Sequence, residues 1–281
     1  MFFFDIDSVK IIFLVNFAHK LNQNKMYRIF RSVIGAGLIV VLTLFTSCEY
    51  SYSVKSIDGG RVAMTKEFDI PADGTETAAI LKSYKAGLDS MMAPVVGHAA
   101  RDLFNYRPES PMSNLMADLL FRNCEKFIGK KADVAVMNIG GIRNVLSHGP
   151  ITCGNIFEIS PFENVLCIVE MDGRTLYELF TQIASVHGEG ISGANLVISK
   201  DGKLISAKVG GEPIDLKKIY RVSTLDYVAE GNDKMVAFTK AKSKIFPNNS
   251  ILRNLLLEYV KDCEKKGILV DAKVEGRIIV K

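Results

Sequence analysis

A largely apolar run, residues 132–137, stops abruptly at the turn Asn138-Ile139-Gly140-Gly141-Ile142-Arg143, and this junction limits the possible folds more than any other part of the sequence. Such a run predicts a buried strand, and paired glycines let the backbone turn tightly or approach a ligand closely. Arg143 supplies a planar fork of hydrogen-bond donors suited to phosphate or carboxylate. The junction can therefore present an amide and a guanidinium to one small ligand, although Gly-Gly beside a solvated arginine is also common at strand ends without a ligand.

The spacing of apolar residues predicts both helices and strands along the chain. The predicted helices are residues 75–92, 111–128, 174–186 and 250–266, and the predicted strands are residues 132–137, 165–171, 196–199, 204–209, 220–225 and 276–280. Asp201-Gly202 predicts a hairpin between two of the strands, and Gly267 predicts the end of the last helix. We therefore predict an α+β fold: a single layered domain of mixed sheets and helices over residues 75–281.

Further motifs accompany the glycine turn in a fixed order. They are Ser160-Pro161-Phe162-Glu163-Asn164, Ile191-Ser192-Gly193, the run 224–233 (TLDYVAEGND) and the upstream run 109–118 (ESPMSNLMAD). Together they resemble the C-terminal, substrate-recognition domain of the 5'-nucleotidase family over roughly residues 78–281. Its motifs are N-x-G-G-I-R, I-T, P-F-x-N, an aromatic residue six positions before an Asp, and E-x-x-x-G-N-L-x-x-D, in which Ser113 replaces the glycine here.

The resemblance implies a nucleoside site. The base would stack between Phe162 and Tyr227, because every base has an aromatic face that such side chains can grip. Asp233 would accept hydrogen bonds from the sugar hydroxyls. Asn138 would meet the edge of the base, and Arg143 would hold a sugar or phosphate oxygen. Each of these residue types also has an ordinary structural role, in a core or a turn.

Two positions depart from the family pattern. The family's first arginine falls on Tyr106, with Arg107 beside it, and Tyr227 replaces the more common phenylalanine and adds a hydroxyl group. We therefore place Arg107 in the site as a candidate ligand. The predicted substrate-binding residues are Asn138, Gly140, Gly141, Arg143, Phe162, Tyr227, Asp233 and Arg107.

The sequence contains no recognisable catalytic motif. The resemblance implies an additional metallophosphatase domain in which two metal ions activate water, and such a site needs several His, Asp and Asn ligands. Four histidines occur here, none in a D-x-H or G-N-H-E run, and neither a P-loop, a G-x-G-x-x-G nor a G-x-S-x-G motif is present. We therefore predict no catalytic residue, metal or cofactor in this chain, and expect the divalent metals in a metallophosphatase domain on a separate chain.

The predicted function is nucleotide recognition in an exported 5'-nucleotidase, which takes part in nucleotide catabolism. The chain would bind an adenosine-like or AMP-like nucleotide and place it for phosphate-ester hydrolysis by the partner subunit. Two alternatives remain open: a lipid-anchored nucleoside-binding protein without catalysis, and an interaction scaffold whose pocket has degenerated.

The beginning of the sequence predicts export. Residues 33–45 are apolar, basic residues precede them, and Thr46-Ser47-Cys48 follows. A transmembrane helix needs about 20 apolar residues, so this pattern is typical of a signal segment. Small residues before a cysteine indicate lipidation at Cys48, with a plain signal peptide or anchor as the alternative. We predict an export segment over residues 1–47, of which 1–25 could be a mis-called start, a tether over 48–74, and a chain lipid-anchored to the bacterial cell envelope.

Charge and cysteine usage narrow the function further. Five Lys or Arg and two Asp in residues 1–47 account for +3 of the formal net charge of +4, so the remainder carries about +1. Binding to a nucleic-acid polymer, which needs a dense basic surface, is therefore not expected. No C-x-x-C pair occurs among the cysteines after Cys48, and their apolar surroundings favour buried free thiols over a disulfide framework.

Overall fold

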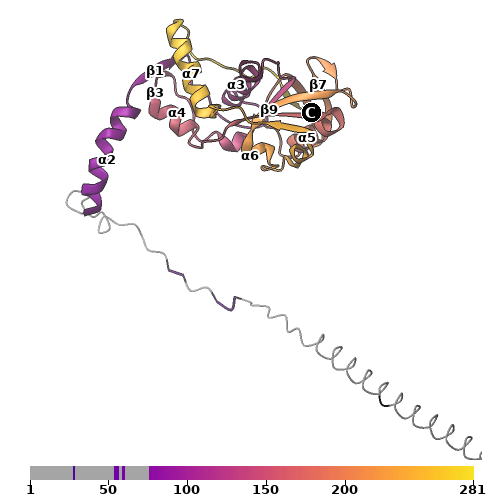
Figure 1. The fold of residues 1–281 in the computed structure, drawn as a ribbon, viewed down its shortest axis with the longest axis horizontal. Coiled ribbons are helices and arrows are strands. Elements are labelled where there is room, and N and C mark those ends of the chain that lie inside the picture. The colour runs from indigo at the N-terminus through magenta and orange to yellow at the C-terminus, as the bar shows by residue number, and fades with distance from the viewer. Residues whose placement is uncertain (1–27, 29–53, 57–58, 61–75) are drawn as a thin grey trace, which may run out of the picture. The chain divides into compact units, whose positions relative to one another are not determined.

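The computed structural model describes residues 28, 54–56, 59–60 and 76–281 (Figure 1). The chain divides into two units, residues 1–70 and 71–281, and the elements discussed here belong to the second. The predicted export segment (apart from Arg28), Cys48 and most of the tether lie outside the described residues. Within the described part, no helix is both long enough and apolar enough to cross a membrane.

A five-stranded sheet forms the centre of the domain, in the order β10-β4-β9-β2-β5. Its strands are β2 (Val134–Met137), β4 (Leu166–Asp172), β5 (Gly190–Ser192), β9 (Ile219–Leu225) and β10 (Ser243–Ile245). The β2 and β9 strands run parallel and the other neighbours antiparallel. All four β2 residues are buried, as expected for a strand covered on both faces.

Two smaller sheets contain the other strands of residues 76–281. One has the order β11-β6-β7-β8, built from β6 (Ala194–Ile198), β7 (Leu204–Val209), β8 (Glu212–Pro213) and β11 (Ile278–Val280). The other pairs β1 (Val95–Ala99) with β3 (Gly149–Thr152). The β6 and β7 strands form the antiparallel hairpin predicted from Asp201-Gly202.

Six α-helices occur in residues 76–281: α2 (Glu76–Met92), α3 (Pro111–Ile128), α4 (Cys153–Ile159), α5 (Gly173–Ser185), α6 (Asp226–Ala229) and α7 (Leu252–Lys265). Ser110 and Ser113 form a reciprocal capping box at the start of α3, with Pro111 in the first turn. Ser113, which stands where the family has glycine, thus satisfies a backbone N–H. After α7, Gly267 adopts the left-handed conformation (φ 66°) predicted for a helix end.

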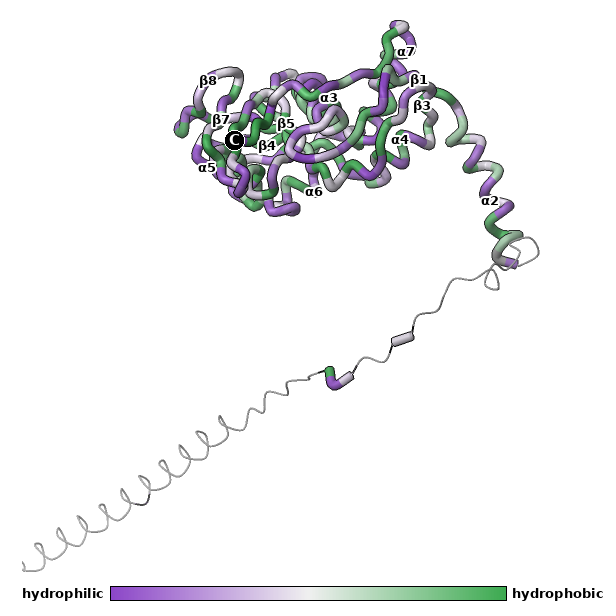
Figure 2. The backbone as a smooth tube through the Cα atoms, turned by 180° about the vertical axis from the view of Figure 1, so that it is seen from behind, coloured by the Kyte–Doolittle hydropathy of each residue, from purple (hydrophilic) through white to green (hydrophobic). Residues whose placement is uncertain are grey.

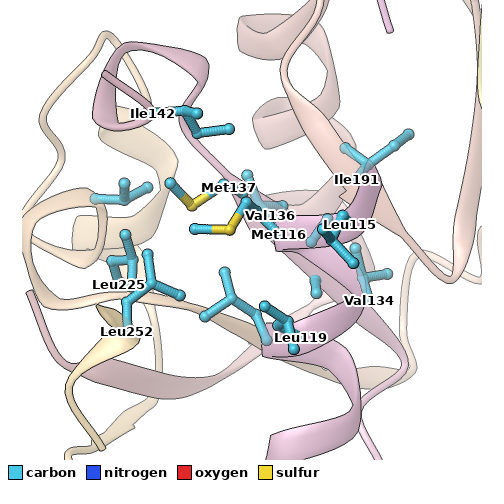
Figure 3. Packing of buried hydrophobic residues seen from close by; sticks show 14 of the residues in the cluster. Leu115, Met116, Leu119, Val134, Val136, Met137, Ile142, Ile191, Leu225 and Leu252 are labelled. Carbon is cyan, nitrogen blue, oxygen red and sulfur yellow. The ribbon is translucent and has the colours of Figure 1, made fainter. Parts of the chain in front are cut away.

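The hydrophobic core lies between α3 and the central sheet. Leu115, Met116 and Leu119 of α3 pack beside Val134, Val136 and Met137 of β2, with Ile142, Ile191, Leu225 and Leu252 around them (Figure 3). Burying each such side chain contributes about 1.5–3 kcal/mol. Figure 2 shows hydrophobic stretches of chain gathered where the central strands lie. The α+β prediction is confirmed, and the packing fixes the end of β2 from which the glycine turn departs.

Candidate functional site

Three segments that are distant in sequence converge at one edge of the central sheet. Because β2 and β9 are parallel, the glycine turn after β2 and the helix α6 after β9 leave the sheet at the same edge. The β4 strand is antiparallel to β9 and pairs Leu166 with Leu225, which brings the preceding loop, residues 160–165, to that edge as well. The sheet topology therefore assembles the site.

A pocket of about 410 Å³ lies at this edge. Its lining residues are Asn138, Gly140, Gly141, Arg143, Phe162, Asn164, Tyr227 and Asp233. Seven of the eight residues selected from the sequence are among them, and Arg107 is not.

The glycine turn brings its backbone close to the pocket. Residues Ile139–Gly141 form a short 3₁₀ turn, and the Asn105 amide donates to the Ile139 carbonyl at 3.0 Å. A Cβ atom at Gly141 would lie 2.9 Å from Oδ1 of Asn138, so any larger residue would force the Asn138 amide to shift. Arg143 folds back so that Nη1 donates to the Gly140 carbonyl at 3.2 Å, which leaves its other donors without a hydrogen-bond partner among the described residues. The turn thus combines close backbone approach with a partly uncommitted guanidinium.

Asp233 joins two walls of the pocket. Nδ2 of Asn138 donates to Oδ2 of Asp233 at 2.7 Å, and the Tyr227 hydroxyl donates to Oδ1 at 3.3 Å. The negative charge of Asp233 is the main reason that the pKa of Tyr227 is raised above its usual value. Asp233 adopts a left-handed conformation (φ 52°), which Asp tolerates better than most residues. The buried Oδ1 of Asn138 has no hydrogen-bond partner in the described structure.

The two aromatic side chains of the pocket are nearly half exposed. Phe162 is 47% and Tyr227 is 43% exposed. Arg253 of α7 supports the loop that carries Phe162, because its Nη1 donates to the Pro161 carbonyl at 3.1 Å. Its guanidinium also lies 4.2 Å from the ring centre of Phe157. Two aromatic surfaces are therefore held at the pocket while remaining available to a flat ligand.

Arg107 lies against a neighbouring segment. Its Nη2 forms an ion pair with the carboxylate of Glu189, and its Nε donates to the Gly188 carbonyl at 2.8 Å. Glu189 is buried and also accepts a hydrogen bond from the Ile139 N–H at 2.5 Å. Burial raises the pKa of Glu189, whereas the Ile139 N–H and Arg107 oppose that rise. The role of Arg107 as a direct ligand stays a prediction.

Sequence reasoning missed several residues that build the site. Asn164 lies within the P-F-x-N motif, so the signal was present, whereas nothing local marks Glu189, Arg253 or Asn105. Each of these three acts on a segment far away in the sequence, so only the fold reveals its partner.

Other clusters and cavities of the described residues are weaker candidates for a functional site than this pocket. Among the described residues, no group of three or more His, Cys, Asp or Glu side chains could hold a metal ion. A second cavity of about 410 Å³ lies along α3 and the C-terminal segment, where most lining side chains are charged or polar. The four cysteines of the described domain are free, and Cys124, Cys167 and Cys263 are buried, as predicted.

Comparisons with known proteins identify the family and fold of the domain that carries the pocket. A family model described as the 5'-nucleotidase, C-terminal domain, matches residues 95–240. The chain is 35% identical over 160 residues to Endonuclease YhcR of Bacillus subtilis, covering 54% of this chain and 13% of that protein. It is 39% identical over 106 residues to Protein UshA of Escherichia coli, covering 36% of this chain and 19% of UshA.

A solved structure shows the same fold. The crystal structure of a 5'-nucleotidase precursor from Thermus thermophilus matches 73% of this chain and 43% of that chain, with a TM-score of 0.64 and 25% identity. The chain therefore spans less than half the length of each of these relatives.

Proposed function

The chain belongs to the 5'-nucleotidase C-terminal domain family, and from this premise we propose that its pocket binds the nucleoside part of a nucleotide. The base stacks between Phe162 and Tyr227, and the sugar hydroxyls donate hydrogen bonds to Asp233. Asn138 contacts the base edge, and the uncommitted donors of Arg143 take a sugar or phosphate oxygen. Gly140 and Gly141 allow the ligand to approach the backbone.

One observation carries this proposal: two half-exposed aromatic rings line the same pocket as a carboxylate that is already oriented by two hydrogen bonds. Exposed aromatic surface at a pocket favours a flat ligand, because stacking on a base contributes about 1–3 kcal/mol. An ionised carboxylate has roughly four lone-pair positions, so Asp233 retains acceptor capacity for sugar hydroxyls.

We further propose that the chain places its nucleotide for a metallophosphatase domain on a separate chain. The pocket side chains grip and orient, and none of them forms a nucleophile-base pair. Divalent metals in the partner would activate the attacking water and stabilise the charge on the phosphate. A lipid anchor at Cys48 would hold the chain at the bacterial cell envelope, a proposal supported by the signal pattern of residues 33–48.

Calorimetric titration of the chain with adenosine, AMP and adenine tests the binding proposal. Saturable binding of adenosine and AMP, stronger than that of adenine, is expected if the ring pair and Asp233 act together. Absence of binding by a folded chain would contradict the proposal and favour the scaffold alternative.

Mixing the chain with a metallophosphatase subunit tests the partnership. We expect the chain to lower the KM for AMP hydrolysis, because it supplies nucleoside contacts that the partner lacks. An unchanged kcat and KM, with nucleoside binding intact, would instead favour the non-catalytic nucleoside-binding protein.

Labelling with a radioactive fatty acid tests the lipid anchor. The label should attach to the wild-type chain and be lost in Cys48→Ser.

A further inference from the structure

A hydrogen bond joins the ion pair between Arg107 and Glu189 to the glycine turn, residues 138–143, and neither residue lines the pocket. Glu189 is 2% exposed, and its two carboxylate oxygens divide their partners between two segments. Oε1 accepts from Nη2 of Arg107, and Oε2 accepts from the backbone N–H of Ile139 at 2.5 Å. One buried side chain therefore connects the loop before α3 to the first peptide of the turn.

The sheet register explains why Glu189 reaches that peptide. In the antiparallel pairing of β2 with β5, Met137 lies opposite Gly190, so Asn138 and Glu189 follow as the next positions across the pair. The glycines that flank Glu189 let its backbone pack closely against the Pro108 and Ser113 segments. A Cβ at Gly188 would lie 2.3 Å from the Pro108 carbonyl oxygen, and a Cβ at Gly190 would lie 2.7 Å from the Ser113 carbonyl oxygen.

We propose that Arg107 and Glu189 are a positioning pair that holds the glycine turn in its ligand-binding conformation. Arg107 then acts on the nucleoside through Glu189 and does not touch the ligand. This inference rests on the proposed function for its ligand, but the hydrogen bond to the turn can be tested without any ligand.

The charges around Glu189 show why it needs Arg107. Burial and the nearby Asp233 disfavour an ionised Glu189, whereas Arg107 and the Ile139 N–H favour it. The Glu189 side chain is buried whereas that of Arg107 is 40% exposed, so removing Arg107 leaves the buried carboxylate without its charged partner, which is destabilising. Neutralising both partners removes that imbalance, so the double variant is expected to recover part of what a single variant loses.

The test uses the full chain with Arg107→Gln, Glu189→Gln and the double variant. Arg107→Gln should weaken binding of adenosine and AMP by the same factor, and adding Glu189→Gln should restore part of the affinity. Coupling between contacting residues of about 0.5–3 kcal/mol corresponds to a recovery of roughly 2- to 150-fold. If Arg107 instead contacts the phosphate, AMP binding falls more than adenosine binding and the double variant shows no recovery, which would overturn the proposal.

Arg101→Gln provides the matched control, because Arg101 also pairs with a carboxylate, Asp271, but both side chains are exposed. It should change neither affinity nor the melting temperature appreciably. If Arg107→Gln fails to fold, Arg107→Lys keeps the charge while losing the fork geometry. An equal loss of adenosine and AMP binding in that variant supports the positioning pair, and a loss confined to AMP overturns it.

Amide hydrogen exchange separates this inference from the proposed function. The Ile139 N–H should exchange faster in Arg107→Gln and slow again in the double variant, whether or not the wild-type chain binds a nucleoside. Failure of nucleoside binding with this exchange pattern intact would overturn only the proposed function. Unchanged Ile139 exchange in all variants would overturn the positioning pair.

Discussion

Replacing Phe162 with alanine should weaken ligand binding strongly while lowering the stability of the chain only slightly. The ring is 47% exposed in the free chain, so its loss should lower the free energy of unfolding by only about 1 kcal/mol, roughly half of what full burial contributes. If the ring forms one wall of a base sandwich, its loss removes about 1–3 kcal/mol of stacking. At about 1.4 kcal/mol per tenfold change, the Kd for adenosine should rise roughly 5- to 150-fold.

Calorimetry gives the affinity, and thermal unfolding of the same samples gives the stability. Phe246→Ala is the matched control, because Phe246 is also 47% exposed but does not line the pocket. The control should leave the Kd unchanged. A Phe162→Ala variant that binds adenosine within twofold of wild type would refute the sandwich, and equal losses in both variants would show that the effect is nonspecific.

Three further predictions follow from the site and the core. Gly141→Ala should weaken adenosine binding, measured by calorimetry, because its Cβ would lie 2.9 Å from Oδ1 of Asn138 and displace that amide. Asp233→Asn should lower the pKa of Tyr227 toward its usual value, as seen by ultraviolet absorbance titration, because the Asp233 charge is the main cause of the raised pKa. Cys167 should react very slowly with a thiol reagent at neutral pH in the native chain, since burial raises its pKa to about 12.

Each of these predictions has a control in the same chain. Gly140→Ala should affect affinity less than Gly141→Ala, because its Cβ would have 3.8 Å of clearance from Asp233. In a Tyr227→Phe background, Asp233→Asn should leave the absorbance titration of the chain unchanged, because the responding hydroxyl group is absent. Cys153, which is only partly buried, should react before Cys167. Equal effects within any pair would contradict the corresponding argument.

Local sequence signals were sufficient for the long elements. The apolar run before the glycine turn became β2, and the Ser110-Pro111 start of α3 was predicted to the residue. Several short elements escaped prediction: β5, for example, has three residues and α6 has four, too few to show a period. Such elements form because neighbouring segments supply their partners.

For the pocket too, local sequence signals identified some residues and only the fold revealed others. Ordered motifs identified seven lining residues, since each motif carries its own side chains to the sheet edge. The environment of Arg107 was beyond local reasoning, because its partner Glu189 lies 82 positions along the chain and is brought close by the packing of α3 and its preceding loop against β5. Arg107, the neighbour of the family's arginine position, contacts Glu189, which in turn accepts a hydrogen bond from the Ile139 N–H of the glycine turn.

A crystal structure of the chain with adenosine tests the central claim most directly. We expect the purine ring between Phe162 and Tyr227, with a sugar hydroxyl within hydrogen-bond distance of Asp233. Adenosine bound away from these residues, or an empty pocket in crystals grown at saturating adenosine, would contradict the claim.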